Sequence, residues 1–123
     1  SEMCIRDRCI AHHSLGAIEG CKSGEFSPPP PSDGMDYATL AGLVSDAADK
    51  LGAMDEDEVN ALEGGDMVFR IGGNTIPFRN EDFIQSFSLP NFYFHATTAY
   101  DILRQLGAPL GKRDFLGQMR INM

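Results

Sequence analysis

The stretch that decides the fold is NEDFIQSFSLPNFYFHATTAYDILRQLG, residues 80–107. It opens on Asn80, a typical N-cap residue, has acidic side chains in its first turn and ends at Gly107, so it predicts a long helix. Pro90 should kink or divide this helix, because proline lacks an N–H and clashes with the preceding turn. One stripe of the helix is apolar at both ends and polar in the middle, and it comprises Ile84, Ser88, Asn91, His95, Thr98 or Ala99, Ile102 and Leu106.

Two more helices are predicted upstream of this stretch. Residues 9–23 place Ala11, Leu15 and Ile18 on one helical face. Asp36 has the character of an N-cap, and the apolar positions that follow it repeat at helical spacing up to Leu51. Residues 26–34 contain four consecutive prolines and predict a stiff connector between the two helices.

Short elements are expected on either side of residue 64, where the spacing of apolar residues changes from that of a helix to that of a strand. Asp55 can cap a short helix that runs through Leu62. Residues 67–78 show the two-residue period of β-strands on either side of a turn at Gly72-Gly73-Asn74. This pattern predicts a small β-hairpin, with Pro77 on an edge strand. Beyond residue 107 we expect an extended tail, docked by Phe115 and Leu116.

Composition restricts the class of protein. The 123 residues suffice for one domain, and 42% of them are hydrophobic, enough to build a core. The formal net charge of −8 repels phosphate backbones and anionic lipid surfaces, so nucleic acid and membrane are not expected partners. We expect a soluble, cytoplasmic protein whose cysteines are too few for a disulfide framework.

The first eight residues, SEMCIRDR, are expected to be foreign to the protein. Residues 3–7 read like the translated end of a transposon adapter used in library preparation, and a genuine polar tail is the alternative. We therefore leave residues 1–8 out of the expected fold. The expected domain spans residues 9–117, with a tail over residues 118–123.

Candidate chemistry centres on histidines. Asn91 and His95 stand four residues apart, so they share a helical face, and buried polar groups there need partners. His12 and His13 are adjacent, and only one can face the core well; we expect His13. One interpretation makes His95 an ordinary core histidine and leaves His12 and His13 in solvent. The other brings His13 and His95 together at a shared metal or substrate site.

Other residue patterns point away from catalysis. A second stripe of the long helix is suited to packing against the hairpin or a partner subunit. No Ser-His-Asp arrangement or activated thiol can be assembled. The members of the second stripe are Tyr93, Thr97, Tyr100 and Arg104.

Two long strings carry a resemblance to a known family. LPNFYFH at residues 89–95 and GKRDFLG at residues 111–117 resemble the bacterial family of domain of unknown function nineteen ninety-three, which is allied to the DinB/YfiT-like helical bundles. The resemblance implies a mainly α fold: a DinB-like four-helix bundle that here lacks its first helix, with a small β-hairpin inserted before the last helix. The relatives carry three histidines around a divalent metal, which implies His13 and His95 as ligands. Asn91 and Ala99 flank His95 at four residues, a departure from the three-histidine pattern.

Three functions follow as alternatives. The first is a metal-dependent or thiol-cofactor-dependent enzyme that uses zinc, nickel or manganese at His13 and His95. The second is a non-catalytic module in which Asn91 and His95 bind a small molecule in a mostly apolar pocket. The third is a helical bundle that forms a homodimer.

Overall fold

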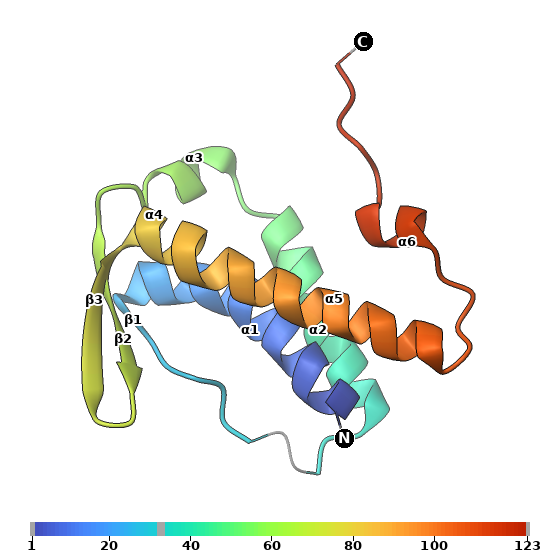
Figure 1. Ribbon diagram of the computed structural model, residues 1–123. Helices are drawn as coiled ribbons and strands as arrows, with labels where there is room; N and C mark the ends of the chain where they lie inside the picture. The colour runs from blue at the N-terminus through green and yellow to red at the C-terminus, as the bar shows by residue number, and fades with distance from the viewer. Residues whose placement is uncertain (1, 32–33, 123) are drawn as a thin grey trace.

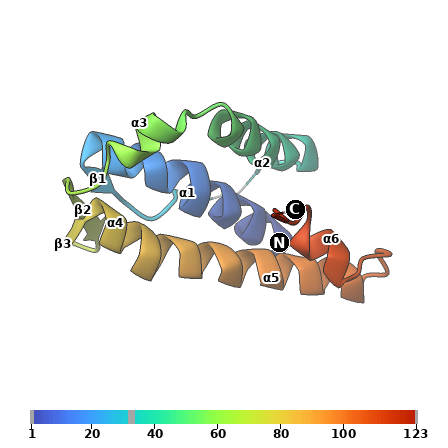
Figure 2. The ribbon, with the colours of Figure 1, turned by 90° about the horizontal axis from the view of Figure 1, so that it is seen from above.

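The protein, described here by a computed structural model over residues 2–31 and 34–122, is mainly helical with one three-stranded sheet. Its long helices are α1 (Glu2–Ser23), α2 (Tyr37–Gly52) and α5 (Leu89–Gln105). Figure 2 shows α1 between α2 and α5, and α1 packs against both. The helix expected from Cys9 begins instead at Glu2, so residues left out of the expected fold form about two additional turns.

The predicted hairpin is confirmed by strands β2 (Asp66–Ile71) and β3 (Asn74–Arg79), which pair antiparallel. Gly72 and Gly73 both have positive φ, 52° and 82°, as a tight hairpin turn requires. A third strand, β1 (Glu25–Phe26), pairs parallel with β2 and was not predicted. The strand order β1-β2-β3 leaves β3, which carries Pro77, at the sheet edge as expected.

Local capping explains where two helices begin. Asp36 accepts a hydrogen bond from the backbone N–H of Thr39 at 2.8 Å, which confirms it as the cap of α2. Asp55 accepts from the N–H of Asp57 at 3.3 Å and starts α3 (Glu56–Asn60). This short helix ends two residues before the predicted Leu62.

The stretch from residue 80 to 105 is one helical path with a change of pitch. It comprises α4 (Asn80–Phe83), the π-helical turn η1 (Ile84–Ser88) and α5. Pro90 lies in the first turn of α5, directly after the wide turn. The π-turn accommodates proline, which has no N–H to give and needs room behind its ring. The helix changes pitch before Pro90 but continues from η1 into α5, so the predicted division at Pro90 is not found.

The prediction that Asn80 caps this stretch is wrong. Arg79 holds the N-cap position, and Asn80 is buried with its side-chain nitrogen donating to the Leu62 carbonyl at 2.8 Å. Asn80 therefore ties the start of the helix to the segment after α3. Its amide satisfies a long-range backbone acceptor instead of a local one.

The buried core lies at the sheet end of the molecule, where Figure 1 shows α1 and α4 against the strands. Aromatic rings dominate it: Phe83 is 0% exposed, and its ring lies 5.1 Å from that of Phe26. The remaining core residues come from α1 and the sheet, and they are Ala17, Cys21, Met67 and Phe69.

The C-terminal segment departs from the expected extended tail by forming α6 (Lys112–Leu116). The ring of Phe115 lies 5.6 Å from that of Tyr100 on α5, so Phe115 does dock. Leu116 is 55% exposed and does not dock, contrary to the prediction. Leu106, expected on the inward stripe, is 78% exposed because α5 extends past its neighbours there.

Candidate functional site

His13 lies in the middle of α1 and is the more buried of the adjacent histidines, at 7% exposure. Its imidazole is surrounded by rings from three other elements. The ring centroids of Phe26, Phe87 and His95 lie 5.7, 5.6 and 5.8 Å away. The His13 and His95 rings are nearly parallel, with an interplanar angle of 7°. The structure thus brings together two residues that are 82 positions apart in the sequence.

Burial holds His13 in its neutral form. Removal from water is the main cause that lowers its pKa to about 4, and the neighbouring His12 and His95 contribute because a second positive charge there would be repelled. Its Nδ1 is buried and has no hydrogen-bond partner among the residues the structure describes. A buried polar atom without a hydrogen-bond partner lowers the stability of the fold by on the order of 1–3 kcal/mol. A ligand group that formed a hydrogen bond to Nδ1 would remove this cost.

His95 meets a guanidinium from the start of α1. Arg6 Nη1 lies 2.8 Å from His95 Nδ1, and because arginine can only donate, Nδ1 must be the acceptor. A neutral His95 therefore carries its proton on Nε2. The same guanidinium lies 5.4 Å from the ring centroid of Phe94, a cation–π distance. Arg6 was missed by the sequence reasoning because residues 1–8 were set aside.

Ser88, from the π-turn, fixes the relative position of the two histidine-bearing helices. Ser88 is 2% exposed, and its hydroxyl donates to the His13 backbone carbonyl at 2.6 Å. That carbonyl thus receives a bond from a second element. The inward stripe predicted Ser88 correctly as a buried residue, but its partner could not be read from spacing.

His12 points to a different face of α1, although its ring centroid lies only 5.7 Å from that of His13. Its Nε2 donates to the Ser27 carbonyl at 2.6 Å, which attaches the proline-rich connector to the helix. Desolvation lowers the pKa of His12, and the hydrogen bond to Ser27 acts in the opposite direction. His12 and His13 therefore serve different surfaces, as adjacent helical positions must.

Asn91 is half-buried on α5, one turn before His95. Its side-chain nitrogen donates to the Phe87 carbonyl at 2.8 Å, a bond within its own helical path. The amide nitrogen of Asn91 thus finds its partner in the backbone and not in His95, which shares its helical face. In the second stripe, the Tyr100 ring packs on Phe115 of α6 and Tyr93 is 56% exposed, so packing of this stripe against a partner subunit stays a prediction.

A divalent metal at this place would need more ligands than the site offers. Catalytic zinc sites use three protein ligands, and here two imidazoles are accompanied by a guanidinium cation. Within residues 2–31 and 34–122, no group of three or more His, Cys, Asp or Glu side chains could hold a metal ion. The donor set does not fit a three-ligand metal centre.

None of the helices in the described part of the chain is both long and apolar enough to cross a membrane.

Comparison with known proteins places the chain. It is similar over 98% of its length, and over 68% of the other chain, to the crystal structure of a DinB family member protein from Shewanella denitrificans, with a TM-score of 0.74 and 20% sequence identity. At that identity the likeness shows the fold alone. No curated protein sequence matches the chain. The sequence pattern of the family described as "Domain of unknown function (DUF1993)" matches residues 7–116, nearly the whole chain. This protein, a mainly helical one with a DinB-like fold, belongs to that family.

Proposed function

We propose that the chain is a non-catalytic domain that binds a small molecule at the His13–His95 pair. The observation that carries the proposal is the Nδ1 atom of His13, which is buried, uncharged and without a hydrogen-bond partner in the part of the chain described. A ligand with a polar end group would satisfy it. The Phe26 and Phe87 rings beside His13 would contact the apolar part of the ligand.

The ligand would enter past His95, because the His95 side chain is half-buried whereas His13 is fully buried. Asn91 is the third residue proposed to contact the ligand. It would do so through its side-chain oxygen, since its nitrogen already donates to Phe87. A neutral His13 suits hydrogen bonding more than charge pairing, so we propose a ligand end group such as an amide or hydroxyl.

The test uses three probes that differ only in their end group: butyramide, butanol and butyrate. Histidine ring resonances are followed by NMR in the whole chain, in His13→Phe and in Gln105→Ala. Phenylalanine fills the place of the His13 imidazole among aromatic rings. Gln105 is an exposed control residue on α5, the helix that carries His95. The proposal expects butyramide or butanol to shift the His95 ring signals in the wild type and in the control, but not in His13→Phe.

Two results would replace the proposal. Shifts in His13→Phe equal to those of the wild type, or no shift with any probe, would remove the His13 site. Stoichiometric binding of Zn²⁺, Ni²⁺ or Mn²⁺ that is lost in His95→Ala would favour the metal-dependent enzyme instead.

We also propose that α1, α2 and α5 correspond to three helices of a four-helix bundle. Large apolar side chains that a further helix could cover stand exposed on α2 and α5: Tyr37 at 83%, Phe94 at 61% and Leu106 at 78%. A chain carrying one additional helix ahead of residue 1 should unfold at a higher urea concentration than residues 1–123. An unchanged midpoint would contradict this architecture.

A further inference from the structure

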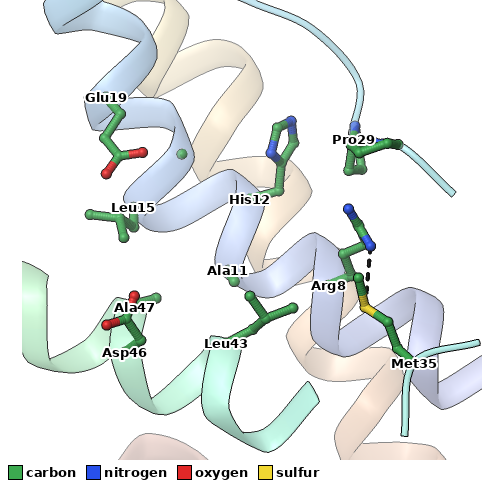
Figure 3. A pocket seen from close by; sticks show the side chains of 12 residues that line it. Arg8, Ala11, His12, Leu15, Glu19, Pro29, Met35, Leu43, Asp46 and Ala47 are labelled. Carbon is green, nitrogen blue, oxygen red and sulfur yellow. Dashed lines mark hydrogen bonds between the residues drawn. The ribbon is translucent and has the colours of Figure 1, made fainter. Parts of the chain in front are cut away.

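A cavity lies between α1 and α2, whereas His95 approaches α1 from α5. It is an open cavity of about 210 Å³ lined by residues of α1, α2 and the proline-rich connector. Figure 3 shows Arg8 and His12 toward one end of it and Glu19 and Asp46 toward the other. The walls between these polar ends are apolar, and they include Ala11, Leu15, Pro29, Met35 and Leu43.

The arginine end is suited to a carboxylate. Arg8 Nη1 has one long contact, 3.4 Å to the Pro31 carbonyl, and one contact of 3.3 Å to the Met35 sulfur, which is a weak acceptor. No carboxylate pairs with Arg8 in the described part of the chain. A guanidinium with weak partners is well matched to a carboxylate, which it can hold with two parallel bonds. Arg8 also lies within the residues that match the family.

The opposite end is suited to a cation. Glu19 forms no ion pair among residues 2–31 and 34–122, while Asp46 pairs with Lys50 at 3.1 Å across one turn of α2. That pair is exposed on both sides and contributes little, so its carboxylate can also serve a ligand. Arg8, His12, Leu15 and Glu19 follow one face of α1, which aligns the two charged ends along the helix.

From this arrangement we infer that the cavity binds a small zwitterion: a carboxylate at one end, an apolar chain in the middle and an ammonium group at the other. A neutral zwitterion also avoids the repulsion that a protein of net charge −8 exerts on a simple anion. This binding is independent of the His13–His95 proposal, because the two sites lie on different faces of α1.

The probes are 6-aminohexanoate and 8-aminooctanoate, with hexanoate and hexylamine as partners that lack one charge. Calorimetric titration of the whole chain should show at least one ω-amino acid binding about tenfold or more tightly than either partner. Arg8→Gln and Glu19→Gln should each weaken that binding by about tenfold. His13→Phe should leave it unchanged, which separates this inference from the proposed function.

A variant that keeps every charge tests the cavity itself. A Cβ at Gly16 would lie 3.1 Å from His12 Nδ1, so Gly16→Ala narrows the space beside His12 while favouring the helix. We expect it to weaken binding of the ω-amino acid, whereas Gly42→Ala, whose Cβ meets nothing within 4 Å, should not. The inference is overturned if neither ω-amino acid binds, if hexanoate or hexylamine binds equally well, or if Arg8→Gln and Glu19→Gln bind as the wild type does.

Discussion

The pKa of His13 links this residue to the stability of the whole fold. The folded value of about 4 lies below the ordinary 6.5, so between these values the unfolded chain binds more protons than the folded chain. The free energy of unfolding should therefore fall as the pH drops from 6.5 to 4. A shift of this size corresponds to roughly 3 kcal/mol over the full window.

His13→Phe removes this titration and keeps a ring in the core. Urea unfolding at pH 7 and pH 4.5 should show a smaller loss of stability in the variant than in the wild type. The carboxylates whose pKa is lowered, such as Asp36 and Glu81, are present in both proteins and so cancel in the comparison. Equal losses would show that His13 is not the neutral, buried base described here.

Residue-level prediction succeeded where the deciding contact is local and failed where it is remote. Asp36 bonds to a neighbour three positions away, so its role was evident from the sequence. Asn80 looks like a cap by the same criteria, but its partner Leu62 lies 18 residues away. The contact also requires a glycine at position 65, because a Cβ there would lie 2.6 Å from the Asn80 amide nitrogen. Spacing alone cannot reveal such a pair.

At the scale of elements, the contact between α1 and β1 depends on Gly20. A Cβ at this position would lie 3.2 Å from the Glu25 carbonyl oxygen and from two Phe26 carbons. Because backbone is involved, the neighbours cannot simply rotate away, and Gly20→Ala should lower the free energy of unfolding by about 1–3 kcal/mol. Urea unfolding measures this change.

Gly42→Ala is the matched control, since it is also a helical glycine but has open space around its Cβ. It should raise stability by about 0.5–1 kcal/mol through helix propensity. If Gly20→Ala raised stability as much as Gly42→Ala does, the close packing of α1 on β1 would be refuted.

The elements that escaped prediction are short ones that depend on distant segments. Strand β1 has two residues and exists because it pairs with β2, more than forty positions away. Helix α6 forms where glycines and a proline suggested irregular chain, with Asp114 accepting a bond from the Gly111 N–H at 2.8 Å. Long helices were predictable because their apolar periodicity repeats over many turns.

At the scale of the whole molecule, α1 is the element that holds the others in place. It contacts α2, α5 and the sheet, whereas α2 buries only Leu40 and Ala47. Helix α2 should therefore open locally at a lower free energy than α1. In hydrogen exchange, amides of residues 40–52 should exchange faster than those of residues 13–23. Equal protection of both helices would contradict this hierarchy.

The mainly helical, DinB-like fold was predicted through resemblance rather than through physical reasoning on the chain. The LPNFYFH and GKRDFLG strings indicated the family that the sequence match then showed. Periodicity located helices and a hairpin, but it contains no information on which helix lies between the other two. The meeting of His13 with His95 depends on that packing.

The most direct test of the account is an NMR titration of the histidine side chains, using long-range correlations between ring protons and nitrogens, from pH 8 to pH 4. We predict that His13 stays neutral until the pH approaches about 4, and that neutral His95 carries its proton on Nε2. A His13 ring that gains its second proton near pH 6.5 would contradict the buried histidine site and the function proposed for it.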